Sequence, residues 1–502
     1  MIRPVNRHPD QQLPGIQKIA LATLTERMQP GHARTGTGYL HMRSVLIAPL
    51  LILFITGCTT TARITNTPVD VTKPVDRKAI TSGRQGQRSD SALFFISFSG
   101  GGTRAAALSY GVLEELRDTS FVFNGEKKRL LDEVDSISSV SGGSFTAAYY
   151  ALYGDRIFED YEDVFLRRNV QKTLIGSVLN PINWVKMGFT KMNRTELAID
   201  YYDRNIFRGS TFADIEARDG PYLEINATDL GIGQRFTFTQ SSFNMLCSDL
   251  GDFSVARAVA ASSAVPIAFK PVTLKNYGGC QHEDPPWVGY TRKNTENNER
   301  LRTLLEGYDS YQDKETRRYI HLVDGGITDN LGVRSLSDRV EATGGALRAF
   351  RDSNTPLPKY IIVIVVNAQT RAAEPMDSSN ESPSNATVLG AVSKTQIGRY
   401  NLESMVLLEE SLERWAAELS TPEHQVTPYF IKLDFESIAD EKIRLIFNNM
   451  ATSFSLPDEE VDNLIEAGHQ LLRISPDYQR LIALIKKAEQ ARNTTAADQQ
   501  TR

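Results

Sequence analysis

Cysteine is scarce in this chain of 502 residues, and its placement excludes one common kind of site. The three cysteines, Cys58, Cys247 and Cys280, form no CxxC motif and join no His/Cys cluster with the ligand spacing of structural zinc. An excess of basic residues is missing too, because the formal net charge is −5, and nucleic-acid binding usually needs a basic face. The sequence therefore predicts a protein without a metal, a cofactor or a nucleic-acid partner.

One apolar run stands out near the N-terminus, and it is short. A Met-Arg pair at residues 42–43 precedes the apolar residues 45–55, which are too few to span a bilayer comfortably and resemble a signal peptide. The run ends in ITGC at residues 55–58, which looks like a bacterial lipobox. This resemblance implies cleavage before Cys58, a diacylglycerol on its thiol and anchoring to a membrane. An ordinary signal peptide with an unrelated cysteine, or a signal anchor, is the alternative.

The segments on either side of residues 42–58 have different characters. Residues 1–41 are polar and aperiodic, so we expect an extension from a misplaced start codon, with Met42 as the true start. Residues 59–90 are rich in Thr, Arg, Ser and Asp, which is typical of a flexible tether. Thr59 is not an inner-membrane retention aspartate, and by resemblance this favours the outer membrane of a bacterial envelope, with the domain in the periplasm.

Export would place the two remaining cysteines in an oxidising compartment. Cys247 and Cys280 could then form a disulfide that closes a loop of some thirty residues, worth about 3–4 kcal/mol in the loop-entropy model. Two free buried thiols are the alternative, because a sequence does not give the distance between the two cysteines.

Predicted strands and helices alternate from residue 93 onward. The apolar residues 93–99 predict a buried strand, and residues 103–117 follow with apolar side chains at helical spacing. A second strand is predicted at 134–140 and a second helix at 145–152. This rhythm predicts an α/β fold with a parallel sheet.

Later segments extend this pattern. More strands are predicted at 222–227, 319–323 and 360–366. The last of these reads YIIVIVV and has no polar face, so it should lie in the middle of the sheet, covered on both sides. From composition we further expect a charged insertion at 281–318 and a surface loop at 371–395. From periodicity we expect amphipathic helices at 402–419 and 459–473, which lie within an extension at 396–480 that packs on the domain. Residues 481–502 are expected to form a tail.

Three glycine-containing motifs follow predicted strands. SGGGTR at 99–104 lies between a strand and a helix, where glycines admit close approach and the helix N-terminus offers N–H groups to an anion. SVSGGS at 139–144 has the strand–turn–helix context of a nucleophile elbow, where residues around the serine must be small. DGG at 324–326 follows an apolar strand, so its aspartate should point into the crevice at the carboxyl ends of the sheet.

Each motif is ambiguous when taken alone. SGGGTR is not a Walker loop, because no Gly-Lys-Ser/Thr follows, and Ala105 stands where a Rossmann motif has its third glycine. A DGG sequence is most often only a turn. Ser141 is the preferred nucleophile because it has small neighbours at positions −2 and +2, whereas Ser138 and Ser144 are rivals.

Taken in order, the three motifs resemble those of the patatin-like phospholipase family. The segment 258–272, AVAASSAVPIAFKPV, resembles the family's region between serine and aspartate, and DGGITDN at 324–330 resembles its continuation after the aspartate. Ser139 departs from the family pattern, since it stands at the first glycine of GxSxG. The resemblance assigns the catalytic domain to residues 91–370.

The resemblance implies a three-layer α/β/α domain with a Ser–Asp dyad that cleaves acyl esters of membrane lipids or lysolipids. Ser141 would attack the carbonyl carbon, and Asp324 would take its proton and later activate water against the acyl-enzyme. Backbone N–H groups of the glycine-rich loop would hold the oxyanion, with Arg104 helping to position that loop. The predicted oxyanion loop consists of Gly100, Gly101, Gly102, Thr103 and Arg104.

Histidines separate this mechanism from a conventional triad. The seven histidines are scattered, at His8, His32, His41, His282, His321, His424 and His469. A conventional hydrolase needs a histidine after its acid, yet only His424 and His469 follow Asp324, and neither is predicted in a strand-end loop. An esterase with a histidine triad would need one of the two, and a silent scaffold lipoprotein would need no serine.

Residues 174–192 form a largely apolar stretch with Lys186 and Lys191. This stretch fits a lid or acyl-chain wall over the site, or a membrane-contacting patch, and it equally fits a plain core helix.

Overall fold

The structure is a computed structural model that describes residues 61–69, 88, 91–123, 126–179, 192–266, 268–280, 284–296, 298–353, 355–371, 375–378 and 380–487. The predicted extension at 1–41, the signal segment at 42–58 with Cys58, and residues 488–502 of the predicted tail lie outside the described residues. Among the described residues, we find no helix both long enough and apolar enough to cross a bilayer.

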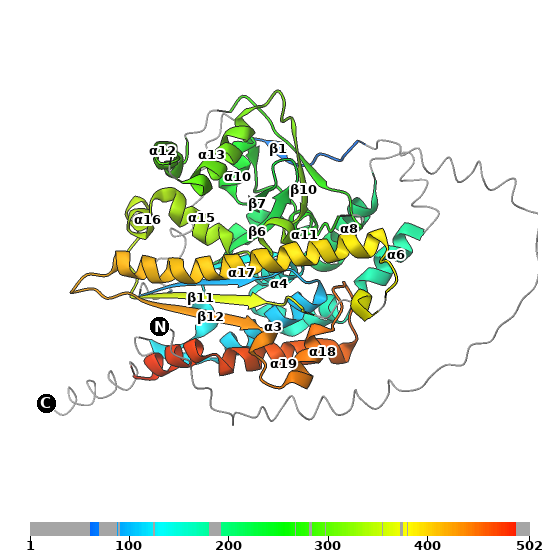
Figure 1. Ribbon diagram of the computed structural model, residues 1–502. Coiled ribbons are helices and arrows are strands. Elements are labelled where there is room, and N and C mark those ends of the chain that lie inside the picture. Colours follow the sequence, from blue (N-terminus) through cyan, green and yellow to red (C-terminus); the bar gives the residue numbers. More distant parts are fainter. Residues whose placement is uncertain are drawn as a thin grey trace, which may run out of the picture.

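A mostly parallel central sheet organises the domain (Figure 1). Its strands follow the order β12-β11-β2-β5-β6-β10-β9, and β7 pairs with β6. The pairs from β12 to β6 are parallel, whereas β10 is antiparallel to both β6 and β9. The strands are β2 (Ala92–Phe98), β5 (Ser136–Val140), β6 (Tyr222–Asp229), β7 (Gln234–Phe238), β9 (Val272–Lys275), β10 (Tyr319–Asp324), β11 (Tyr360–Asn367) and β12 (Thr427–Asp434). The α/β class predicted from the sequence is confirmed.

Helices and two short ribbons surround this sheet. The ribbons pair β1 (Thr67–Pro68) with β8 (Ser248–Asp249) and β3 (Ser120–Phe123) with β4 (Glu126–Arg129). The described helices include α3 (Thr103–Asp118), α4 (Gly142–Tyr153), α5 (Ile157–Tyr161), α6 (Val170–Leu179), α8 (Arg194–Tyr202), α9 (Phe212–Glu216), α10 (Gln240–Met245), α11 (Val255–Ser262), α12 (Pro286–Lys293), α13 (Glu299–Gln312), α14 (Gly326–Asp329), α15 (Arg334–Thr343), α16 (Ala346–Asp352), α17 (Asn385–Leu419), α18 (Glu441–Asn448) and α19 (Asp458–Ile474).

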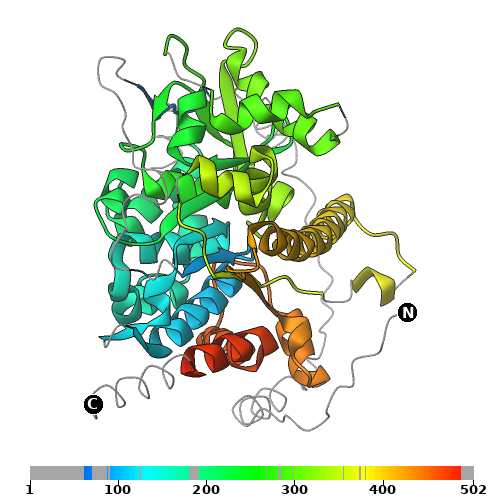
Figure 2. The same ribbon diagram turned by 90° about the vertical axis from the view of Figure 1, so that its left-hand side faces the viewer.

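Alternating side chains of the central strands separate two apolar cores. The even-numbered residues at 362–366 of β11 face a core shared with α3, α4 and α19. The odd-numbered residues at 361–365 face a second core, shared with α17. Figure 2 shows α17 almost end-on, across the strands from the red helix α19. The strand without a polar face is therefore covered on both sides, as a three-layer arrangement requires.

The C-terminal region completes the sheet, so the boundary predicted at residue 370 does not separate two units. Strand β12 pairs with β11 along its whole length, from Tyr360↔Thr427 to Asn367↔Asp434. This addition makes β11 the second strand from the edge, where the prediction had it in the middle of the sheet. Helical residues continue to 487, and Leu481 is buried, so the predicted tail begins too early.

One further prediction was wrong in its bounds. The loop expected at 371–395 ends at Ser384, because the Ser384 hydroxyl accepts the N–H of Thr387 and caps α17 at Asn385. Small and polar residues at 385–395 read as a loop, yet they also suit an exposed helix that starts at a good cap. The insertion expected at 281–318 contains helices α12 and α13.

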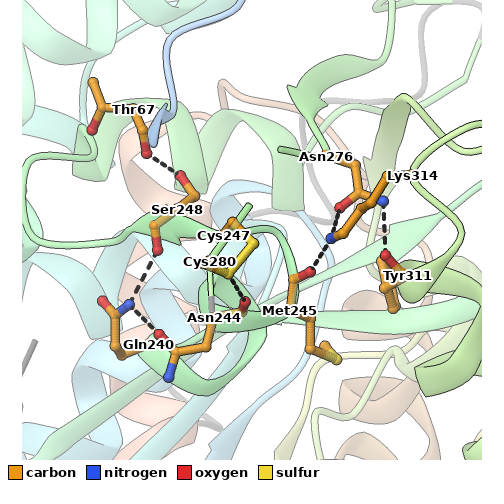
Figure 3. Close-up of a disulfide and its surroundings, with 10 residues drawn as sticks. All are labelled: Thr67, Gln240, Asn244, Met245, Cys247, Ser248, Asn276, Cys280, Tyr311 and Lys314. Atoms are coloured by element: carbon orange, nitrogen blue, oxygen red, sulfur yellow. Dashed lines mark hydrogen bonds between the residues drawn. A yellow bond between two sulfur atoms is a disulfide. The ribbon is translucent and has the colours of Figure 1, made fainter. Parts of the chain in front are cut away.

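The predicted tether at 59–90 is in part a docked segment, because residues 61–69 pack on the domain. Asn66 is buried, and its amide both donates to the Lys275 carbonyl (2.9 Å) and accepts the Lys275 N–H (2.9 Å). The carbonyl of Thr67 accepts the Ser248 hydroxyl at 2.6 Å (Figure 3). Backbone pairing of β1 with β8 adds to these contacts.

A disulfide lies next to this docked segment at residues 61–69, which we call the strap, because the Val69 N–H donates to the Cys247 carbonyl. Cys247 and Cys280 are bonded, with their Cα atoms 5.5 Å apart and a sequence separation of 33 (Figure 3). Beside it, Lys314 donates to the Met245 carbonyl and the Asn276 amide at 2.6 Å each, and burial lowers the pKa of Lys314 to about 8. The disulfide, the strap and this lysine hold together the periphery beyond β9 and β10.

Removing the disulfide should lower stability without dissolving the fold. The double variant Cys247→Ser/Cys280→Ser frees a 33-residue loop in the unfolded state, so its free energy of unfolding should fall by about 3–4 kcal/mol. Urea denaturation of the variant, beside wild type with and without reductant, measures the change. Equal midpoints for all three samples would show that the bridge does not constrain the unfolded chain.

Candidate functional site

Strand register brings the serine and aspartate motifs together across β6. Val140, the last residue of β5, pairs with Asn226, and Asp324, the last residue of β10, pairs with the next residue, Ala227. Because β10 is antiparallel to β6, Asp324 reaches this level from the direction opposite to that of β5. The sequence placed the aspartate at a strand end correctly, but a parallel sheet was expected there.

Ser141 occupies a strained turn between β5 and α4. Its φ and ψ are 49° and −118°, which is a costly conformation for a residue with a side chain. A Cβ on Gly142 would lie 2.0 Å from the Gly102 carbonyl oxygen, so only glycine fits after the serine. The Ser141 N–H donates to the Ser262 hydroxyl at 2.8 Å, which helps to hold the turn. These features are those of a nucleophile elbow.

The Ser141 hydroxyl donates a hydrogen bond to the carboxylate of Asp324. The Ser141 Oγ to Asp324 Oδ2 distance is 2.9 Å, and the other carboxylate oxygen accepts the Gly326 N–H at 2.8 Å. Burial raises the pKa of Asp324 to about 6, against the opposing effect of these two hydrogen bonds. A carboxylate with this pKa is ionised at neutral pH and basic enough to accept a proton from a neighbour.

The rival serines are engaged elsewhere and are fully buried. Ser138 accepts the Asn226 side-chain N–H at 2.8 Å, and Ser144 shares a 3.1 Å hydrogen bond with Ser262. No described carboxylate bonds to either hydroxyl. The geometry therefore favours Ser141 as the nucleophile.

The glycine-rich loop lies directly over Ser141, but only part of it is available to an oxyanion. A Cβ on Gly100 would lie 3.3 Å from the Ser141 Cβ. The Gly100 N–H already donates to the Asn330 carbonyl (2.9 Å), and the Thr103 N–H to the Ser453 carbonyl (2.8 Å). Within the described chain, the amides of Gly101 and Gly102 have no such acceptor. The predicted set of donors thus narrows to these two, because neighbouring carbonyls already occupy the other two amides.

Arg104 supports the loop and does not face the serine. Its guanidinium donates to the Ala368 carbonyl (2.8 Å), the Met450 carbonyl (2.9 Å) and the Thr452 hydroxyl (3.0 Å). Burial lowers the pKa of Arg104 to about 10, so it stays charged at neutral pH. It ties the loop to the end of β11 and to the segment before α19, which fits the positioning role expected from the sequence.

Sequence reasoning missed three residues that shape the site. Ser262 bonds to the Ser141 N–H, Asn330 holds Gly100, and Ser453 holds Thr103. The first two lie in the quoted segments 258–272 and 324–330, so their place was indicated but not their role. Ser453 belongs to the C-terminal region, where no motif pointed to it.

Described histidines have structural partners away from the dyad. His321 bonds to the Thr273 hydroxyl (3.1 Å), and His424 to the Pro358 carbonyl (3.0 Å). His469 lies between Glu114 and Glu466, at 3.2 and 3.3 Å. None of the three bonds to Ser141 or Asp324. Within the described part of the chain, no cluster of three His, Cys, Asp or Glu side chains could hold a metal ion.

The stretch predicted as a lid or a core helix is described only in part. Helix α6 covers its beginning, with Leu174 buried and the Ile175 side chain 52% exposed. Residues 180–191 lie outside the described residues.

Comparison with known proteins finds a family model that matches this part of the chain. Residues 96–337, which include Ser141 and Asp324, match the family model described as "Patatin-like phospholipase". Among solved structures, the chain resembles one titled "Human GIVD cytosolic phospholipase A2", at 12% identity and a TM-score of 0.39, covering 82% of this chain and 65% of that one. No curated protein sequence matches the chain significantly.

Replacing the buried carboxylate should stabilise the protein at neutral pH. The folded-state pKa of Asp324, about 6, lies above the usual value of 3.8, so ionisation weakens the folded state as pH rises through this window. Asp324→Asn keeps the shape and removes the charge. We expect its free energy of unfolding to exceed that of wild type by about 2–3 kcal/mol at pH 7.5 and by about half of that at pH 5. Urea denaturation at both pH values tests this, and a destabilised variant at pH 7.5 would contradict the assigned pKa.

Proposed function

We propose that the patatin-like phospholipase domain at residues 96–337 is a lipid acyl hydrolase that works through a Ser141–Asp324 dyad. The observation that carries this proposal is the 2.9 Å hydrogen bond from Ser141 to Asp324, at a strained turn and beneath a glycine-rich loop. The family match supports the reaction class, acyl ester hydrolysis on lipids. Membrane phospholipids or lysolipids are the proposed substrates.

Acylation begins with proton transfer inside the dyad. Asp324 Oδ2 takes the hydroxyl proton as Ser141 Oγ attacks the ester carbonyl carbon. The oxyanion that develops lies toward the amides of Gly101 and Gly102, which have no competing acceptor among the described residues. The protonated Asp324 then gives its proton to the departing alcohol, and Ser141 carries the acyl group.

Deacylation repeats the same steps with water. Asp324 accepts a proton from a water molecule, which attacks the acyl carbonyl, and the proton returns to Ser141 as the fatty acid leaves. The Gly326 N–H keeps the carboxylate aimed at Ser141 throughout, because it holds the other oxygen at 2.8 Å. No histidine takes part in this cycle.

Location at the envelope forms part of the proposal. Cys58 would carry the lipid anchor, and the strap at 61–69 would attach the domain a few residues beyond it. The disulfide supports an oxidising compartment, because such bonds persist there and are rare in the cytosol. The outer membrane, facing the periplasm, is the proposed site.

The dyad and the histidine triad make opposite predictions for point variants. Ser141→Ala and Asp324→Asn should each lower kcat/KM on a nitrophenyl ester and on phospholipid micelles by about 10³-fold or more, because each removes an essential group. His424→Ala/His469→Ala, a double control, should stay within about twofold of wild type on both substrates.

Two results would contradict the assignment of a Ser141–Asp324 dyad. An active Ser141→Ala variant would move the nucleophile elsewhere. Wild-type protein without activity on either ester would favour a scaffold lipoprotein that keeps the fold. Circular dichroism of each variant shows whether a lost rate reflects chemistry or unfolding.

Activity should depend on pH through the raised pKa of Asp324. The dyad needs the carboxylate, so kcat/KM should fall as pH drops through about 6, by about tenfold per unit below it. An ordinary aspartate would keep its activity down to about pH 4. Initial rates on a soluble ester between pH 4.5 and 8 test this, and a flat profile above pH 5 would show that the catalytic base does not have the raised pKa assigned to Asp324.

A further inference from the structure

The first half of helix α17 extends past the edge of the sheet where the dyad lies. Asn401 donates to the Gln369 side chain at 2.7 Å, and Gln369 is the second residue after the end of β11. Residues 385–397 therefore lie beyond this edge, over about 20 Å at the rise of an α-helix. Figure 1 shows this yellow end of α17 at the end of the molecule toward which the arrows of β11 and β12 point, with α6 at the same end.

Apolar side chains form an exposed stripe on this helix. The stripe consists of Val388, Val392, Leu402 and Val406, with exposed fractions of 43%, 51%, 57% and 44%. Their spacings of four, ten and four residues place them on one side of an α-helix. Leu389, 51% exposed, widens the stripe at its N-terminal end. Four aliphatic residues exposed in one row exceed the isolated apolar residues that a soluble surface normally shows.

Charge is segregated along the same helix. Residues 382–402 contain no Asp or Glu but include Lys394 and Arg399, whereas the helix beyond them carries five glutamates, at Glu403, Glu409, Glu410, Glu413 and Glu418. The chain as a whole has a net charge of −5. The end of α17 beside the site is therefore apolar and cationic, and the end away from it is anionic.

Helix α6 has a similar character and contacts the segment that holds the glycine-rich loop. Gln171 at its start accepts the Phe454 N–H, and the preceding residue, Ser453, holds Thr103. Residues 170–179 of α6 contain Lys172 and no acid. Ile175 is 52% exposed on α6. Two acid-free helical segments with exposed aliphatic side chains thus lie at the end of the molecule toward which β11 points.

We propose that the first half of α17 and helix α6 dock the site onto the surface of a bilayer that contains anionic phospholipid. Aliphatic side chains enter the boundary between head groups and acyl chains, and Lys and Arg are attracted to anionic head groups. Docking presents a lipid ester to Ser141 directly from the membrane. This inference rests on the proposed function and adds its substrate class, phospholipid within an anionic bilayer.

Vesicle binding tests the docking face directly. The protein is a chain that starts at residue 59, which keeps every described residue and carries no acyl anchor. Val388→Glu/Val392→Glu places two carboxylates on the stripe. Leu347→Glu/Leu357→Glu is the matched control, because both leucines are exposed but lie on α16 and before β11, at the opposite end of the sheet. Each chain is sedimented with vesicles of pure phosphatidylcholine, or with vesicles in which about 30% of the lipid is the anionic phosphatidylglycerol.

The docking proposal predicts a specific pattern. Wild type and the control should bind the anionic vesicles about tenfold more tightly than the neutral ones, and the stripe variant should lose about tenfold or more in that binding. All three should hydrolyse a soluble nitrophenyl ester within about twofold of one another, because the stripe does not touch the dyad.

Failure of the docking face can be told apart from failure of the function. Equal vesicle binding by the stripe variant and wild type, with soluble ester hydrolysis intact, would overturn the docking proposal alone. Loss of binding in the stripe variant without hydrolysis by any chain would overturn the Ser–Asp function and leave the docking face standing. Light scattering could instead show that wild type is a dimer and the stripe variant a monomer, with equal vesicle binding by the two. The stripe would then be a self-association surface, and the docking proposal would be overturned.

Discussion

The hydrogen bond between Ser141 and Asp324 is the contact around which the central part of the fold is arranged. Its partners come from strands that run in opposite directions, and they meet because β5 and β10 end level with each other on β6. Keeping a carboxylate buried there is costly, and the raised pKa of Asp324 expresses that cost. Keeping Ser141 in its turn is costly as well. Both costs are typical of a site that is prepared for chemistry before a substrate arrives.

Support for the site comes from the whole chain. The glycine-rich loop is fixed by Asn330 from the segment after Asp324 and by Ser453 from the C-terminal region. Arg104 connects the same loop to the end of β11 and to Met450. The C-terminal region is therefore part of the same folded domain, since it supplies β12 to the sheet and two of the contacts that position the loop. A chain cut at residue 370 would lose them.

Much of the site could be predicted from the sequence because its chemistry depends on local motifs. Steric limits within a few residues require small residues around Ser141 and glycines after Asp324, so both motifs can be recognised in the sequence alone. The antiparallel direction of β10 was missed, because strand direction depends on pairing with β6, some ninety residues earlier in the chain. The availability of Gly101 and Gly102, but not of Gly100 and Thr103, depends on carbonyls from distant segments, and no local pattern encodes it. The start of α17 was missed because small residues are common there, and a solvent-exposed helix of such residues has the composition of a loop.

The most direct test of the central claim is the reaction of a fluorophosphonate probe, followed by peptide mass spectrometry. The probe modifies a serine only when a nearby base activates it. At pH 7.5, a Ser–Asp dyad predicts stoichiometric label on Ser141 in wild type and at least about a hundredfold slower labelling in Asp324→Asn. Label on another serine, or equal labelling rates in the two proteins, would contradict the dyad.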